Sequence, residues 1–134
     1  MGQLIAKILE EQGYAPEIVA WCWMQGEADA CEEQHMPHYE RRYDAMLADL
    51  RAGFAKYFAP DCKFIDAGIS QTWPFHVQMN ELKRAYATKI PGGVFVDTIG
   101  AGLTVLNEPQ PEVDIYHYDS DSTIKLGHLF AEHI

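Results

Sequence analysis

Three short apolar runs, separated by segments with helical spacing, constrain the fold of this chain most strongly. The first run, Ile18 to Met24, is nearly unbroken and rich in bulky residues, which is typical of a strand covered on both faces. Phe64 to Ile69 and Gly93 to Thr98 are the second and third predicted strands. Because parallel strands need helical crossovers between them, the alternation predicts an α/β layered domain with a parallel sheet.

Four segments have apolar residues at helical spacing. They cover about residues 4–9, 38–58, 77–88 and 120–133. Gly13 is suited to end the first of these helices, Pro37 to stand in the first turn of the second, and Pro60 to mark its end. The last helix is expected to direct three apolar side chains inward: Ile124, Leu129 and Phe130.

The number of predicted strands is small. A parallel sheet buried on both faces usually has more than three strands, so part of the sheet is expected to be missing or supplied by another chain. At 134 residues the sequence has the length of one domain. We therefore expect a single, partial domain over residues 1–134.

Composition and charge exclude several classes of protein. Hydrophobic residues make up 48% and charged residues 22% of the chain, as in ordinary soluble domains. The net charge of −10 argues against nucleic-acid and membrane partners, since nucleic acids and anionic membranes both need a positive surface. No apolar stretch approaches the ~20 residues of a membrane span, and the amino terminus lacks a signal-peptide pattern. These features predict a cytoplasmic protein.

The cysteines support the same compartment. Cys22, Cys31 and Cys62 are odd in number and not closely paired, so we expect no disulfide framework and a reducing environment. Cys22 lies within the first apolar run and is expected in the core.

A polar triplet follows the first predicted strand directly. In an open parallel sheet ligands bind beyond the carboxyl ends of the strands, which is where Gln25, Gly26 and Glu27 fall. This location favours a functional site. The alternative is that Gln25 and Glu27 cap the following segment.

A second polar group, Asp114-Ile115-Tyr116-His117, precedes the last helix. Three-residue spacing lets the carboxylate of Asp114 reach Nδ1 of His117, which would leave Nε2 to accept a proton. Such a pair is the orienting acid and base of an acyl-transfer triad. Taken alone it is common by chance, and a solvated acid beside a structural histidine is the alternative.

Other polar and aromatic residues are weaker candidates. Ser70 follows the second predicted strand without the glycines of a nucleophile turn, so we interpret it as a loop or capping serine. Ser120 and Ser122 are expected to cap the last helix. Trp73, in the loop after the second strand, is either a platform for a sugar ring or a lid on the core.

No cofactor or metal is expected. His35 and His38 have a zinc-like spacing, but Pro37 between them and the lack of a further ligand cluster indicate a solvated helix start. The sequence has no Gly-rich phosphate-binding loop of the P-loop or dinucleotide type.

Taken in order along the chain, these motifs resemble a known family. The motifs that carry the resemblance are WMQGEADA, the helix ending YDAMLADLRAGF, then DTIGAGL, and the DxxHYDS motif followed by LGHLFAEHI. The chain resembles the carbohydrate-esterase branch of the SGNH hydrolase superfamily. The similarity is to sialate O-acetylesterase and acetylxylan esterase-like proteins of carbohydrate esterase family 6, and covers about residues 18–134. It implies a flavodoxin-like three-layer α/β/α sandwich and a serine esterase that removes acetyl groups from an O-acetylated carbohydrate.

The resemblance also implies roles for individual residues. His117 would be the general base and Asp114 would orient it. Gln25, beside Gly26, would donate a hydrogen bond to the oxyanion. Glu27 would be a pocket carboxylate that shares or replaces the role of Asp114, and the division between the two acids stays open.

One part of the family pattern is missing from this sequence. The nucleophilic serine of the family belongs to a GQSN-type motif after the first strand, and no such motif occurs here. We therefore expect the carboxyl-terminal part of an esterase, without the first two strands and inactive by itself. A missing amino-terminal segment or a second copy is expected to pair with strand 18–24. The alternative is an inactive carbohydrate- or protein-binding module with a degenerate esterase fold.

Overall fold

The computed structural model describes residues 2–106 and 114–134. Its sheet contains three strands in the order β1-β2-β3, formed by Ile18–Trp23, Phe58–Ala67 and Gly93–Val96. Both neighbouring pairs are parallel, with Asp66 of β2 opposite Trp23 on one side and Phe95 on the other. The predicted α/β class and parallel sheet are confirmed.

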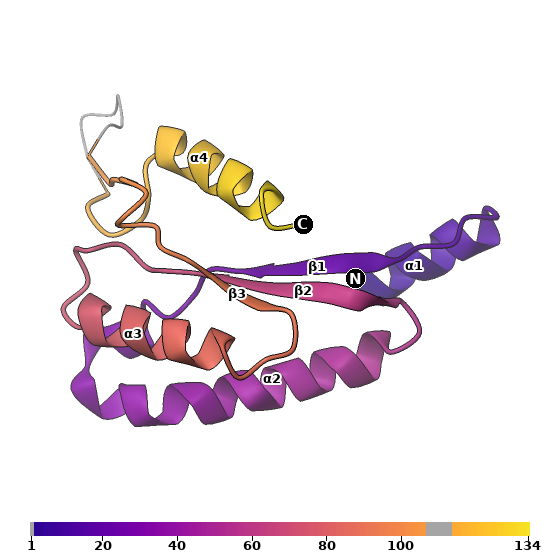
Figure 1. Ribbon diagram of the computed structural model, residues 1–134, viewed down its shortest axis with the longest axis horizontal. Helices are drawn as coiled ribbons and strands as arrows, with labels where there is room; N and C mark the ends of the chain where they lie inside the picture. The colour runs from indigo at the N-terminus through magenta and orange to yellow at the C-terminus, as the bar shows by residue number, and fades with distance from the viewer. Residues whose placement is uncertain (1, 107–113) are drawn as a thin grey trace.

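Helices cover both faces of this sheet. The α-helices are α1 (Gly2–Glu11), α2 (Tyr39–Phe54), α3 (His76–Ala87) and α4 (Ser120–Ala131), and two 3₁₀ segments cover Asp29–Cys31 and Glu33–His38. Figure 1 shows α2 and α3 on one face, α4 on the other, and α1 beyond the amino ends of the strands. The body of the protein therefore has the three layers of a flavodoxin-like SGNH fold.

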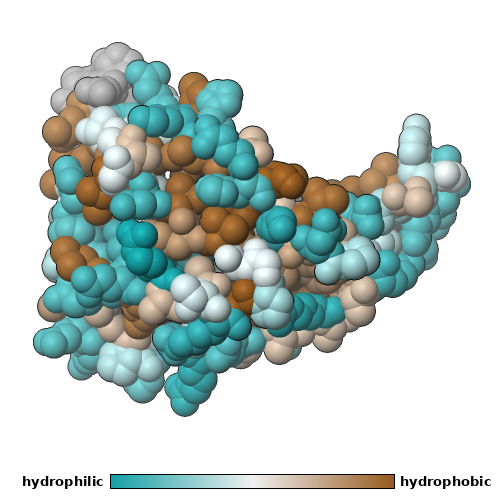
Figure 2. Space-filling view, in the orientation of Figure 1, coloured by the Kyte–Doolittle hydropathy of each residue, from teal (hydrophilic) through white to brown (hydrophobic). Residues whose placement is uncertain are grey.

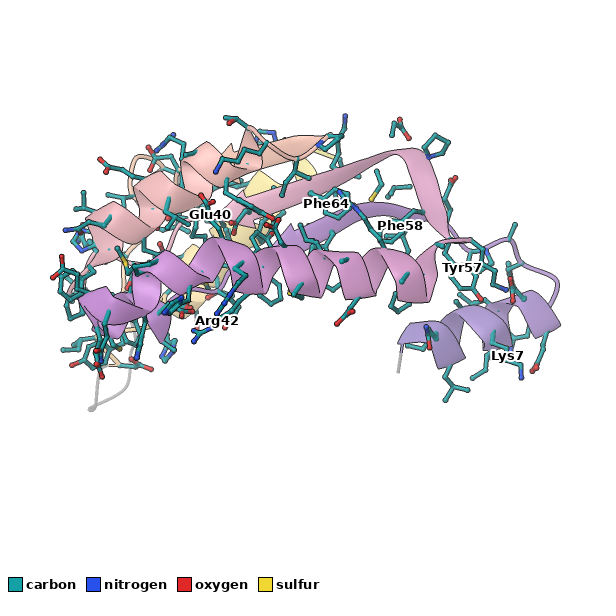
Figure 3. The ribbon with its side chains drawn as sticks, turned by 90° about the horizontal axis from the view of Figure 1, so that it is seen from below. Lys7, Glu40, Arg42, Tyr57, Phe58 and Phe64 are labelled. Carbon is teal, nitrogen blue, oxygen red and sulfur yellow. The ribbon has the colours of Figure 1, made fainter. Side chains whose placement is uncertain are left out.

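The core lies on both sides of β2. Toward α2 and α3 it contains mainly aromatic and large apolar side chains, including Tyr43, Phe64 and Met79. Toward α4 it contains smaller aliphatic ones, including Ile65 and Leu126. Figure 3 shows Phe58 and Phe64 of β2 beside α2, with Tyr57 next to α1. The central strand is thus the one buried on both faces.

The prediction that the first strand is covered on both faces is wrong, and so is the core position of Cys22. Val19 is 48% exposed, and Cys22 is also exposed. The physical reason is the position of β1 at the edge of the described sheet, while the cluster under α4 is built mainly on β2 and β3. Apolar character alone does not reveal whether a strand is central or at an edge.

Two prolines lie in elements other than those predicted. Pro60 is inside β2, which begins at Phe58, and does not follow a helix. The register between β1 and β2 shifts from Ile18↔Phe58 to Ala20↔Lys63, so Pro60 lies in the irregular part of the strand, where a missing N–H donor is tolerated. Pro37 lies in a 3₁₀ segment before α2 instead of its first turn.

The inward face of α4 also differs from the prediction. Ile124 is 64% exposed, whereas Leu126 is buried. Leu129 and Phe130 pack partly against the core, as expected. Residues 122, 126 and 130 follow the four-residue spacing of one helical face, and Ile124 lies off that face.

Helix α1 forms an arm on the body of the protein. Gly13, at φ 88°, follows the helix as predicted. An ion pair of 2.8 Å between Lys56 Nζ and Glu10 Oε1 joins the arm to the segment after α2. Leu4 and Ile5 remain 60% and 53% exposed. Figure 2 shows this arm projecting from the body, with a concave outline between the two.

Candidate active site

Residues 116–118, shortly before α4, lie over the carboxyl ends of β2 and β3. Tyr118 anchors this segment, because its hydroxyl donates to Thr98 Oγ1 at 2.7 Å and lies 3.2 Å from the Gly68 carbonyl oxygen. Burial raises the pKa of Tyr118 to about 12, so the phenol stays protonated and can donate. The neighbouring His117 is thereby held at the edge of the sheet where ligands of parallel α/β domains bind.

His117 and Asp114 form the predicted pair. Nδ1 of His117 lies 2.6 Å from Oδ2 of Asp114, while Oδ1 accepts hydrogen bonds from the backbone N–H groups of Tyr116 and His117 at 2.8 and 3.2 Å. The hydrogen bond from His117 lowers the pKa of Asp114, with help from the Tyr116 N–H. Both side chains are more than half exposed. With Nδ1 turned to the carboxylate, Nε2 is the nitrogen available to exchange a proton.

Trp73 lies beside this pair. Its indole N–H donates to the Tyr116 carbonyl at 3.0 Å. Its ring centroid is 5.0 Å from that of Tyr116 and 6.1 Å from that of His117, and the Trp73 and His117 rings are inclined at 73°. An aromatic surface next to a candidate base is suited to contact the apolar face of a sugar ring.

Ser70 has a structural position in the same loop. It is 3% exposed, and its hydroxyl donates to the Tyr116 carbonyl at 2.7 Å. Thr72 Oγ1 lies 2.9 Å from the same hydroxyl. This agrees with the interpretation of Ser70 as a loop serine, because its proton is committed to the main chain. At α4, Asp119 instead of the predicted serines accepts the capping hydrogen bond, from Ser122 N–H at 2.8 Å.

The Gln25-Gly26-Glu27 turn follows β1 at the same edge of the sheet. Gln25 is exposed and Glu27 is half-buried. Gly26 has a φ of 132°, and a Cβ there would lie 3.2 Å from Met79 Sδ, so both conformation and space favour glycine. Gln25 and Gly26 line a cavity of about 220 Å³ together with residues of α2, including Tyr39 and Arg42. Figure 3 shows Arg42 on α2.

The structure brings the predicted residues together as two groups. Asp114 and Trp73 both contact His117, whereas none of the three lines the cavity of Gln25 and Gly26. The charge of Glu27 adds to the effect of burial in raising the pKa of Tyr118, which is next to His117 in the chain. Of the two candidate acids, Asp114 is the one hydrogen-bonded to the His117 ring within the described residues.

Sequence reasoning missed a buried ion pair beneath the turn. Lys83 Nζ lies 3.1 Å from Asp66 Oδ1, and the two side chains are 0% and 3% exposed. Burial raises the pKa of Asp66 to about 6 and lowers the pKa of Lys83. One signal could have revealed the pair: Lys83 falls four residues after Met79, within the apolar stripe of α3.

Residues 2–106 and 114–134 contain no group of three or more histidine, cysteine, aspartate or glutamate side chains placed to hold a metal ion. None of the helices described there is both long and apolar enough to cross a membrane.

The fold and the acid–histidine pair at the carboxyl edge of the sheet define an α/β domain of the SGNH esterase class. A family model described as carbohydrate esterase, sialic acid-specific acetylesterase, matches residues 2–134. The chain belongs to this family. A search of curated proteins gave no match.

Proposed function

We propose that this chain forms the base, acid and oxyanion side of a carbohydrate O-acetylesterase that acts on O-acetylated sugars such as sialic acids. The observation that carries the proposal is the 2.6 Å contact between His117 Nδ1 and Asp114 Oδ2. It holds the imidazole in the tautomer a base needs, at the ligand-binding edge of the sheet. The family match supports the substrate class.

The proposed reaction is acyl transfer through a serine. Nε2 of His117 accepts the serine proton as the serine oxygen attacks the acetyl carbonyl, then gives that proton to the departing sugar oxygen. Water next attacks the acetyl-serine, again losing its proton to Nε2, and acetate leaves as the serine oxygen takes the proton back. A positioned base contributes about 10²- to 10⁴-fold in rate. Asp114 orients the ring during both steps.

The remaining residues act on the substrate. The side-chain amide of Gln25, beside Gly26, donates to the oxyanion, an interaction whose loss typically costs about 3 kcal/mol. Trp73 contacts the sugar ring. Glu27 is a proposed second carboxylate of the site, and its share in holding His117 is decided by comparing Asp114→Asn with Glu27→Gln.

The nucleophilic serine is proposed to come from outside residues 1–134. The Ser70 hydroxyl donates to the main chain, and the Ser122 hydroxyl accepts from the Thr104 N–H at 2.8 Å. The edge of β1 that faces away from β2 is the proposed place for a further strand, from an amino-terminal segment or a second copy. Deuterium exchange of the β1 amides with and without such a partner tests this pairing.

Esterase assays test the nucleophile proposal. The 134-residue chain and His117→Ala are compared on p-nitrophenyl acetate and on O-acetylated sialic acid, with fluorophosphonate labelling followed by peptide mapping. We expect equal, background turnover and no labelled serine. Turnover that depends on His117, with the label on Ser70, would contradict an external nucleophile.

Ligand titration tests the substrate class. We expect O-acetylated sialic acid to perturb the NMR signals of Trp73 and His117, and Trp73→Leu to weaken binding. Trp73→Phe is the matched control, since it keeps a ring while losing the N–H donor. Tighter binding of acetylated xylo-oligosaccharides would move the proposal to a xylan esterase.

The second candidate function is an inactive carbohydrate- or protein-binding module. The committed hydroxyl of Ser70 and the lack of a GQSN motif favour it. The coding region upstream of Met1 discriminates between the two. A continuous frame encoding a strand followed by GQSN supports the esterase, and its absence supports the binding module.

A further inference from the structure

The Lys83–Asp66 pair has no part in the chemistry described above. Both side chains are buried, with Nζ and Oδ1 3.1 Å apart. Replacing a buried ion pair by apolar residues of similar volume is often neutral or stabilising, so stability alone does not account for one. A second hydrogen-bond partner of Lys83 indicates what else the buried pair does.

That partner is the main-chain carbonyl of Gln25. Lys83 Nζ donates a hydrogen bond to this oxygen, and the Tyr39 hydroxyl is a second, longer donor at 3.4 Å. Lys83 lies on α3, and Asp66 is the next-to-last residue of β2. The ammonium group thus joins a helix and the central strand to the turn that follows β1.

The turn depends on this support because it adopts an unusual conformation. Gly26 has a φ of 132° and packs against Met79, while its carbonyl accepts a hydrogen bond from Ala30 N–H at 2.8 Å. With the Gln25 carbonyl held toward the buried lysine, Gln25 itself stays exposed. Glu27 lies near enough for its charge to influence the pKa values of both Asp66 and Lys83.

We propose that Lys83 is a positioning residue of the esterase site: its ammonium group, held by Asp66, fixes the Gln25–Gly26 peptide so that the Gln25 amide faces the substrate. The functional part of this inference rests on the proposed oxyanion role of Gln25. The hydrogen bond that Lys83 makes does not depend on that role.

NMR of the 134-residue chain tests the hydrogen bond directly. A buried, slowly exchanging Lys83 ¹⁵Nζ signal is expected, with scalar coupling to the Gln25 carbonyl carbon. The double variant Asp66→Asn/Lys83→Met should lose this coupling and shift the Gly26 amide signal. The double variant leaves no lone buried charge, so it is the one expected to fold. Lys89→Met, at an exposed lysine paired with Glu40, is the control and should change nothing at Gln25.

Titration with O-acetylated sialic acid tests the positioning role. We expect the double variant to bind about tenfold more weakly, as for the loss of one hydrogen bond to a ligand, and to lose the response of the Gln25 side-chain amide. The signals of His117 should still respond. Unchanged affinity and an unchanged Gln25 response in the double variant would overturn the inference.

The two proposals fail in different ways. A wild-type chain whose His117 and Gln25 signals ignore the sugar contradicts the proposed function and the site role of Lys83 with it. A missing coupling between Lys83 and Gln25 in a wild-type chain that does bind the sugar contradicts the positioning inference alone.

Discussion

Removing the buried pair should change how the stability of this protein depends on pH. Asp66 is 2% exposed, and burial raises its pKa from 3.8 to about 6. The folded protein therefore holds this proton more tightly than the unfolded chain does. The contribution of Asp66 to stability is greatest below pH 3.8 and is lost as the pH rises through about 6.

The size of the effect follows from the two pKa values. A difference of about two between the folded and unfolded pKa corresponds to about 3 kcal/mol, at 1.36 kcal/mol for each pH unit. The lowered pKa of Lys83 acts with the opposite sign, because stability then rises with pH up to the ordinary value of 10.5. Between pH 3.8 and about 6 the titration of the Asp66 carboxyl should set the slope.

Urea unfolding of the wild type and of Asp66→Asn/Lys83→Met at a series of pH values measures how the buried pair changes the pH dependence of stability. The difference in unfolding free energy, wild type minus double variant, should fall by about 3 kcal/mol across that window. At neutral pH, Asp66→Asn alone should lose about 3 to 5 kcal/mol, because it leaves a buried ammonium without its counter-ion. If the unfolding free energies of the wild type and the double variant changed equally with pH, the raised pKa of Asp66 would be refuted.

Three further predictions concern single residues. His117→Ala should raise the pKa of Asp114 toward its ordinary value, measured by ¹³C titration of the carboxyl group. The rise should be incomplete because the hydrogen bond from the Tyr116 N–H remains. An unchanged pKa would show that His117 is not the main partner of Asp114. Gly26→Ala should destabilise the fold by about 1 to 3 kcal/mol in urea unfolding, since alanine is strained at φ 132°; equal stability would contradict that geometry. Asp119→Ala should cost about 1 kcal/mol in thermal unfolding through loss of the α4 cap, and Asp119→Asn, which can still cap, should cost less.

Features that depend on neighbouring residues were predictable. The helical spacing of 77–88 matches α3 to within one residue at each end, because a helix face is set by residues three and four apart. The contact between Asp114 and His117 was predictable for the same reason, since three positions separate them and one turn closes the distance. The parallel sheet followed from the alternation of strands and helices.

Features that depend on residues distant in the chain were not. Cys22 and Val19 look like core residues by composition, yet their exposure depends on which strands flank β1 and where α4 lies. The strand around Pro60 was hidden because its register shift is a property of the pair and not of either strand. Each of these features is set by how strands and helices distant in the chain pack together.

By itself the sequence determined the layered class, the polar turn after the first strand and the acid–base pair before the last helix, because these arise from short-range spacing. Only the tertiary structure decided what holds the polar turn. Lys83 is 58 residues from Gln25, and its ammonium reaches that carbonyl because α3 packs on the sheet beside Asp66. A buried charge must find its partners through the fold, so no local pattern could have named them.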